Sequence, residues 1–131
     1  MAFLVPTVLR PSSVHGTGVF AAEPIAAGTR LWEFTEGVDW KIPPEALAAF
    51  PEPYQARLRA WCFLSDEGVY VLCGDAAKFM NHADAPNCDE TGGGRYTDAN
   101  RDIAAGEELT CDYRTFDLES AGGVHFDPPA S

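Results

Sequence analysis

Residues 78–88 read KFMNHADAPNC, an asparagine–histidine pair followed by a proline and a second asparagine. Each of the two side-chain amides, Asn81 and Asn87, can donate and accept hydrogen bonds at the same time. Alone, such a segment is ordinary turn chemistry, because asparagine, aspartate and proline all favour turns. His82 alone would be interpreted as a structural histidine rather than as a ligand or a base. The meaning of this segment therefore depends on the rest of the chain.

Two turns with glycine stand on either side of it. Residues 14–20 read VHGTGVF, and two glycines one residue apart let the backbone approach a ligand closely or adopt a positive φ. No βαβ unit surrounds them, so they are not a nucleotide fingerprint, and alone most such pairs are simply turns. Residues 103–113 read IAAGEELTCDY, a turn into a strand that ends in Asp-Tyr. By itself, that tyrosine would be an ordinary interface aromatic.

The regions between these segments predict short strands and a small helical insertion. Glycine (12) and proline (10) punctuate the whole chain, as expected for many strands joined by tight turns. The strand candidates are rich in β-branched and aromatic residues and lie at residues 3–9, 18–22, 30–35, 69–73, 95–103 and 108–113. Two short helices are expected over residues 43–50 and 55–60. The chain is therefore predicted to be one mostly β domain with a short helical insertion.

In this order and spacing, the three segments resemble the SET domain of protein lysine methyltransferases. That family has a GxG turn, then an Arg/Lys-Phe-x-Asn-His-Ser-x-x-Pro-Asn-Cys segment, then Gly-Glu-Glu-Leu-x-x-Asp-Tyr. The resemblance covers roughly residues 8–117. It implies a β-clip of small sheets with a C-terminal pseudoknot, in which the segment bearing Tyr113 passes through a loop near Asn81 and His82. The SET domain is expected over residues 1–117, with an insertion at about 36–60, and residues 118–131 form a tail that is one candidate for closing the substrate channel.

The resemblance also assigns the site. S-adenosylmethionine would be the cofactor and Tyr113 the catalytic residue, and no metal is expected. The cofactor would be bound by backbone groups of the glycine turn and by the asparagine–histidine pair: His15, Gly16, Thr17, Gly18, Asn81 and His82. A channel for the lysine should have aromatic walls, which shield its stem and stabilise a cation. The channel candidates are Trp61, Phe63, Tyr70, Glu90, Cys111 and Phe116, with Phe126 as a further one. For Phe63 and Tyr70, core packing explains the residue equally well.

Elementary chemistry is consistent with these roles. Methyl transfer from a sulfonium to an amine is a direct displacement, so alignment of the reacting atoms supplies most of the rate. The lysine must arrive neutral although its free pKa is about 10.4. A narrow apolar channel and a neighbouring sulfonium both lower that pKa. A tyrosine hydroxyl such as that of Tyr113 can orient the amine without being a strong base. Asp112 is expected to anchor the turn, with a role as catalytic base as the alternative.

The chain departs from the family pattern at several positions. Cys111 stands where many relatives have Phe or Tyr, and the smaller side chain predicts methylation beyond the first methyl group. Glu90 falls where some relatives carry a channel tyrosine, so an acid near the entrance could attract the substrate ammonium. Ala83 replaces the usual serine. No cysteine-rich zinc segment follows Tyr113, so residues 114–126, a partner subunit or the substrate would close the channel; this form resembles small viral and bacterial members.

Composition narrows the class of partner. The chain has 131 residues and a formal net charge of −11; residues 1–83 hold 9 acidic and 6 basic side chains, and residues 84–131 hold 11 and 3. Such a surface disfavours nucleic acid and favours a basic protein or lysine-rich peptide, although acidity also aids solubility. A homodimer is one way to cover the substrate side. No apolar run is long enough for a membrane helix, and no signal peptide is visible.

The four cysteines contain no CxxC pair, so neither a zinc site nor a disulfide framework is indicated. Reduced thiols point to a cytoplasmic protein, with access to a host nucleus or chromatin left open. The favoured function is S-adenosylmethionine-dependent methylation of a lysine in a basic protein, histone-like, ribosomal or similar. The alternatives are a catalytically weak or inactive SET-like module that binds a basic peptide, and an acidic β-clip interaction protein without a cofactor.

Overall fold

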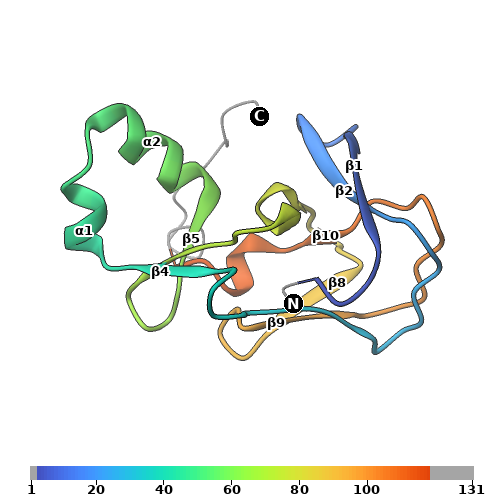
Figure 1. The fold of residues 1–131 in the computed structure, drawn as a ribbon. Helices are drawn as coiled ribbons and strands as arrows, with labels where there is room; N and C mark the ends of the chain where they lie inside the picture. Colours follow the sequence, from blue (N-terminus) through green and yellow to red (C-terminus); the bar gives the residue numbers. More distant parts are fainter. Residues whose placement is uncertain (1–2, 119–131) are drawn as a thin grey trace.

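The computed structural model describes residues 3–118, which form small β-sheets and two short α-helices (Figure 1). Two sheets have two strands each: β1 (Thr7–Pro11) with β2 (Thr17–Ala21), and β7 (Asn81–His82) with β10 (Thr110–Cys111). The other two have three strands each, in the orders β3 (Arg30–Glu33), β9 (Tyr96–Ala99), β8 (Cys88–Thr91) and β4 (Trp40–Ile42), β6 (Tyr70–Leu72), β5 (Cys62–Leu64). The predicted mostly β fold is thereby confirmed.

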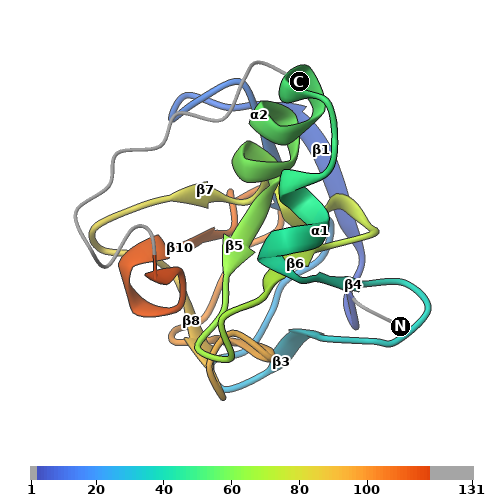
Figure 2. The same ribbon diagram turned by 90° about the vertical axis from the view of Figure 1, so that its left-hand side faces the viewer.

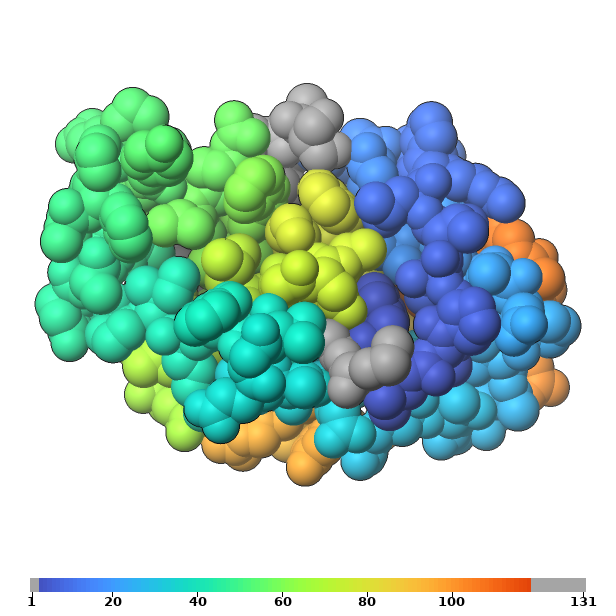
Figure 3. Space-filling view, viewed as in Figure 1, coloured from blue at the N-terminus to red at the C-terminus, as the bar shows by residue number. Residues whose placement is uncertain are grey.

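Two helices form the predicted insertion, α1 (Pro44–Ala48) and α2 (Glu52–Trp61). Each begins directly after a proline N-cap and has a further proline in its first turn, where the missing N–H removes no helical hydrogen bond. Figure 1 shows both helices at one end of the molecule and β1 with β2 at the other, and Figure 2 views the molecule from the helical end. The space-filling view separates the same two ends on the surface (Figure 3).

The strand predictions were right in place but not in length. Strands β3, β6, β9 and β10 lie within the expected segments and are shorter, and β2 has the expected length but begins one residue earlier. The expected strand at residues 3–9 was wrong at its start, because regular pairing begins at Thr7 and Phe3 forms only an isolated bridge with Trp32. Strands β4, β5, β7 and β8 were not predicted.

Two clusters of buried side chains stabilise the fold. The larger cluster joins β2, β3, β8, β9 and β10, and its most buried members are Val19, Leu31, Cys88, Ile103 and Leu109. The smaller cluster consists of Leu47, Cys62 and Tyr70 and attaches the helical insertion to the β4–β6–β5 sheet. No helix within residues 3–118 has the length and apolar character required to cross a bilayer.

The parallel pair of β7 and β10 has the greatest consequence for function. Thr110 lies opposite Asn81 and Cys111 opposite His82, so two motif segments far apart in sequence become neighbours. Parallel strands cannot be joined by a tight turn, and the long intervening chain supplies β8 and β9. Two 3-10 helices border the pair: η1 (Ala76–Phe79) precedes β7, and η2 (Tyr113–Thr115) follows β10.

Candidate functional site

Asn81 joins three distant parts of the chain at the glycine turn of residues 15–18. Its side chain is buried, and its amide Nδ2 donates to the carbonyl oxygen of His15 and to Oε2 of Glu108, each at 2.9 Å. A longer contact of 3.4 Å reaches the carbonyl oxygen of Thr17. Because Asn81 lies on β7, the parallel pair with β10 sets the position of this amide relative to the turn.

The carboxylate of Glu108 also contacts the glycine turn. Ser12 Oγ donates to Glu108 Oε1 at 2.7 Å, and this carboxylate lies against Gly18. A Cβ atom on Gly18 would stand 2.3 Å from Glu108 Oε2, closer than side chains tolerate. Gly16 differs, because its φ is +45° and no heavy atom lies within 4 Å of the place where its Cβ would be. The turn therefore has open space at Gly16, whereas the Glu108 carboxylate packs against Gly18.

The histidine of the pair holds the backbone at Tyr113. The Tyr113 N–H donates to His82 Nδ1 at 3.1 Å, so this nitrogen carries no proton in the contact. The other ring nitrogen of His82 lies 2.9 Å from Oδ1 of Asp84. Asp112 caps η2, as expected of an anchor: its Oδ1 accepts from the N–H of Arg114 at 3.0 Å. Hydrogen bonds from the Arg114 guanidinium lower the pKa of Asp112 and keep it ionised.

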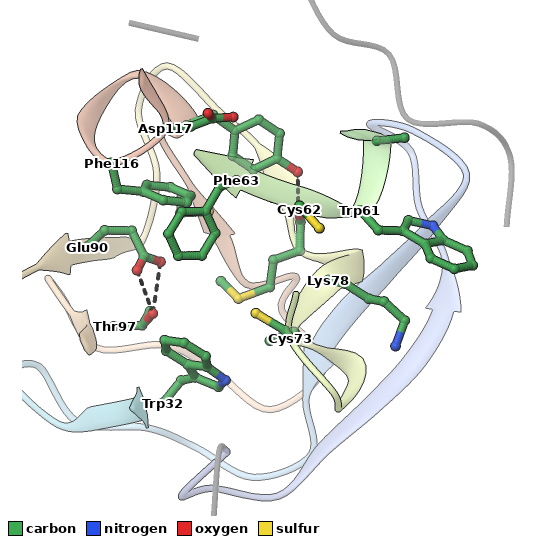
Figure 4. Close-up of a pocket in the computed structure, with 15 residues that line it drawn as sticks. Trp32, Trp61, Cys62, Phe63, Cys73, Lys78, Glu90, Thr97, Phe116 and Asp117 are labelled. Carbon is green, nitrogen blue, oxygen red and sulfur yellow. Dashed lines mark hydrogen bonds between the residues drawn. The ribbon is translucent and has the colours of Figure 1, made fainter. Parts of the chain in front are cut away.

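A cavity is lined by aromatic side chains and by Met80, the residue before Asn81; we call it the aromatic cavity (Figure 4). It encloses about 570 Å³, its open mouth included. The sequence named six of the residues that line it: Trp61, Phe63, Glu90, Cys111, Tyr113 and Phe116. It did not name the others: Trp32, Ala60, Cys62, Cys73, Ala77, Lys78, Met80, Thr97 and Asp117.

The rings in the aromatic cavity pack edge to face. The centroids of Phe63 and Phe116 are 4.9 Å apart with an interplanar angle of 81°, and those of Tyr113 and Phe116 are 6.0 Å apart at 88°. This arrangement is favourable for aromatic pairs. The Tyr113 hydroxyl donates to the carbonyl oxygen of Met80, the residue before β7. Burial raises the pKa of Tyr113, so its hydroxyl stays protonated and acts as a donor.

Glu90 is an acid within this mostly apolar lining. Its two carboxylate oxygens accept from Thr97 Oγ1 at 2.8 and 2.9 Å, a pair that faces across β8 and β9 (Figure 4). Burial, with smaller contributions from Asp98 and Asp89, raises the pKa of Glu90 to about 8. The carboxyl group therefore changes its charge near neutral pH.

Cys111 faces the aromatic cavity from β10 and is 2% exposed. Burial raises the pKa of its thiol well above the ordinary value, so the thiol stays protonated. Cys62, Cys73 and Cys88 are also buried and form no disulfide. Within residues 3–118, no group of three or more His, Cys, Asp or Glu side chains could hold a metal ion.

Tyr70 is not part of the aromatic cavity, contrary to expectation. It packs in the smaller core cluster with Leu47 and Cys62, and its hydroxyl accepts from Arg59 Nη1 at 3.1 Å. Side chains alternate between the two faces of a strand, and Tyr70 lies on the face of β6 that the helical insertion covers. Phe126 lies outside the described residues, as does the tail at 119–131.

Sequence reasoning did not single out Ser12, Glu108 or Thr97. Glu108 was within the quoted segment at 103–113, and its place next to a predicted strand was the signal available. Its role depends on Gly18, which is 90 positions away in sequence and adjacent in space. Thr97 had no such signal, because only the pairing of β8 with β9 brings it to Glu90.

Comparison with known proteins gives consistent matches. The chain is 32% identical over 121 residues to an H3 lysine-4 specific histone-lysine N-methyltransferase of Yarrowia lipolytica, and 31% identical over 118 residues to one of Saccharomyces cerevisiae. Each alignment covers 83% of this chain but 10% and 11% of the relative. The chain therefore spans about a tenth of the length of these curated relatives.

Two solved structures share the fold. A humanized mutant of the Chaetomium thermophilum Polycomb Repressive Complex 2, bound to the inhibitor GSK126, is 27% identical with a TM-score of 0.65, over 88% of this chain and 16% of that one. A candidate histone methyltransferase of Plasmodium falciparum has a TM-score of 0.61 at 19% identity, over 83% of this chain and 93% of its own. Residues 16–114 match the SET domain family. The chain, homologous to histone-lysine N-methyltransferases, therefore belongs to the SET domain family.

Proposed function

We propose that this chain transfers methyl groups from S-adenosylmethionine to a lysine side chain of a basic protein. The aromatic cavity is the observation that carries the proposal, because its lining combines aromatic side chains with the Tyr113 hydroxyl. The Tyr113 hydroxyl lies in this cavity and donates to Met80, and the next residue, Asn81, donates to the glycine turn. The histone-lysine N-methyltransferases among the relatives support the same reaction class.

The glycine turn fits the proposed cofactor. The residues that would hold it are those named from the sequence: His15, Gly16, Thr17, Gly18, Asn81 and His82. Open space beside Gly16 leaves room for a ligand against the backbone. The carbonyl oxygens of His15 and Thr17 and the Glu108 carboxylate all accept from the Asn81 amide, which fixes the backbone of the turn. When bound, S-adenosylmethionine supplies a methyl group activated on a sulfonium.

The aromatic side chains and Tyr113 would position the lysine for methyl transfer. The rings of Trp61, Phe63 and Phe116 exclude water from the lysine stem and stabilise a cation near their faces. The protonated Tyr113 hydroxyl orients the amine, since alignment supplies most of the rate in a direct displacement. Cys111 leaves more room beside the amine than the Phe or Tyr of relatives, and we propose that the product goes beyond monomethyl-lysine.

The net charge of −11 supports a basic substrate, such as a histone-like or ribosomal protein. An acidic surface raises the rate at which a cationic partner arrives. We propose that the reaction takes place inside a cell, in the cytoplasm or at host chromatin, because the four free thiols suit a reducing compartment. A second copy of the chain, the tail or the substrate itself would close the aromatic cavity.

A methyl-transfer assay tests the proposal. Labelled S-adenosylmethionine is incubated with the protein and with core histones or ribosomal proteins as acceptors. Tyr113→Phe removes one hydroxyl, and we expect the single-turnover rate to fall by about tenfold or more because the amine loses its orientation. Binding of S-adenosylhomocysteine, measured by calorimetry, should stay unchanged. Tyr54→Phe makes the same chemical change at a side chain that is 64% exposed and should have no effect.

The outcomes separate the competing functions. Transfer to lysine that is lost in Tyr113→Phe supports the enzyme. Binding of the cofactor and of a basic peptide without any transfer would indicate an inactive SET-like module. Absence of cofactor binding would leave an interaction protein. Full activity in Tyr113→Phe would contradict the role proposed for this tyrosine.

A further inference from the structure

Within residues 3–118, no counter-charge pairs with the carboxyl group of Glu90, which lines the aromatic cavity. Its polar partner is Thr97, which donates to both carboxylate oxygens. Among the ion pairs within residues 3–118, none involves Glu90, although Asp98 on the neighbouring strand pairs with Arg30. A side chain of this kind is costly to bury, because desolvation disfavours its charged form. A desolvated carboxyl group without an ion pair lowers stability, which suggests that Glu90 serves a function in the cavity.

The groups that surround Glu90 add no positive charge to it. Its own strand contributes Asp89 and the thiol of Cys88, and β9 contributes Asp98. Cys73, Cys111, Tyr113 and Asp117 line the same cavity. Lys78 is the cation among the cavity residues, and its Nζ donates instead to the carbonyl oxygen of Asp75 at 3.1 Å and lies 6.0 Å from the Trp61 ring.

We propose that Glu90 is the base that removes the proton from the incoming lysine ammonium; this rests on the proposed function. One N–H bond of the ammonium breaks, its electron pair remains on nitrogen as the lone pair that attacks the methyl group, and an O–H bond forms on a carboxylate oxygen of Glu90. The proton then leaves to water through the open mouth of the aromatic cavity. Each further methyl group requires the same step again.

The energetics favour this carboxyl over an ordinary one. A free glutamate has a pKa of about 4.3 and a free lysine one of about 10.4, so the transfer would be uphill by about six pKa units. Burial raises the pKa of Glu90 to about 8, which reduces the difference to about two units. The apolar lining lowers the pKa of the lysine further, since a neutral acid and a neutral amine are easier to bury than two ions.

The other groups in the aromatic cavity are less suited to this step. The raised pKa values of Tyr113, Cys73 and Cys111 keep them protonated, so they cannot accept a proton at neutral pH. Asp117 is buried, and its Oδ1 accepts from the backbone N–H of Leu64 at 3.0 Å, which fixes it in a structural role. Glu90 is bound by a hydroxyl that can rotate away.

Two measurements test the assignment. The first is a pH titration of the protein labelled with ¹³C at the glutamate carboxyl carbons, in which Glu90→Gln identifies the Glu90 signal. This measurement needs neither cofactor nor substrate, and we expect the signal to titrate near pH 8. A midpoint below pH 6 would overturn the proposal whether or not the protein is an enzyme.

The second is the pH dependence of single-turnover methyl transfer to core histones. In the parent we expect the rate to rise through a midpoint near pH 8. In Glu90→Gln the rate at pH 7.5 should fall by about 100-fold, the magnitude typical of a lost general base, and the midpoint should disappear. Glu90→Asp keeps a carboxyl group and should recover part of the rate. Binding of S-adenosylhomocysteine should be the same in all three proteins.

A matched control removes one negative charge from the same strand. Asp89 is exposed and accepts from Asn100 Nδ2 at 3.0 Å, outside the aromatic cavity. Asp89→Asn should keep the rate of the parent and shift the midpoint only slightly to lower pH, because Asp89 makes a small contribution to the raised pKa of Glu90. If the parent methylates and Glu90→Gln retains its rate and profile, the role of Glu90 is wrong and the proposed function stands. If the parent transfers no methyl group, the proposed function fails, and the carboxyl titration still decides whether Glu90 has the properties of a base.

Discussion

The two glycines of the turn at residues 15–18 serve different physical purposes. Gly16 has a φ of +45°, a left-handed conformation that residues with a Cβ adopt at a cost. Gly18 does not have a positive φ, and its requirement is spatial, because the Glu108 carboxylate occupies the place of a Cβ. The same carboxylate accepts from Ser12 and Asn81, so the packing at Gly18 also sets the orientation of the Asn81 amide.

Gly18→Ala should therefore disturb a hydrogen-bond network rather than a backbone angle. We expect the free energy of unfolding in urea to fall by about 1–3 kcal/mol, as for other overpacked sites, and the affinity for S-adenosylhomocysteine to fall with it. Glu108→Ala removes the atom in conflict, so adding Gly18→Ala to it should cost much less. Equal costs in the two backgrounds would contradict the contact as the cause.

The helical insertion is attached to the sheets by few side chains. Helix α2 has no buried residue, whereas α1 buries Leu47 completely. Leu47 packs with Cys62 and Tyr70, so it joins α1 to β5 and β6. Strand β5 itself carries Phe63, which lines the aromatic cavity, and Trp61, which also lines it, is the last residue of α2. The packing of Leu47 therefore helps to position two side chains that line the cavity, Trp61 and Phe63.

Leu47→Ala should show this dependence. A fully buried leucine replaced by alanine costs about 2–5 kcal/mol through lost transfer energy and a residual cavity. We expect a loss in that range in urea unfolding, with a weaker effect of the variant on cofactor binding than on methyl transfer. Phe50→Ala, at a side chain of the same insertion that is 45% exposed, should change stability by no more than about 0.5 kcal/mol. Similar losses in both variants would show that Leu47 does not anchor the insertion.

At the scale of the whole molecule, acidity makes stability depend on pH in two opposite senses. The pKa of Asp112 and that of Glu107 are lowered, each chiefly by a hydrogen bond from an arginine, so the stability they provide is lost at acid pH. The pKa of Asp39 and that of Glu90 are raised by burial, so the folded state holds protons that the unfolded state has released. Net repulsion at −11 acts in the same direction as the second pair.

Stability should consequently fall as the pH rises between about 4.5 and 8. In that window the folded chain binds more protons than the unfolded chain through Glu90, and by linkage the free energy of unfolding decreases with pH. One pKa unit corresponds to about 1.4 kcal/mol, so a total loss of a few kcal/mol is expected. Urea unfolding at several pH values measures the slope, and Glu90→Gln should flatten it. An unchanged slope in that variant would exclude Glu90 as the source.

The sequence by itself determined the family, the order of the motif segments and the placement of the insertion, because these depend on residues close together in the chain. It also predicted strands β2, β3, β6, β9 and β10, whose composition is locally distinct. It could not predict β7 or β8, which are short and exist through pairing with partners far away in sequence.

The tertiary structure alone decided which side chains meet. It placed Tyr70 in the smaller core cluster rather than in the aromatic cavity, and Glu108 behind Gly18. It also brought Thr97 within hydrogen-bond distance of the Glu90 carboxyl group and shielded that group from water. The proposal that Glu90 accepts a proton depends on both features. The physical reason is common to all three: the face to which a strand residue points, and the charge it can carry there, depend on register and burial, which pairing between distant segments sets.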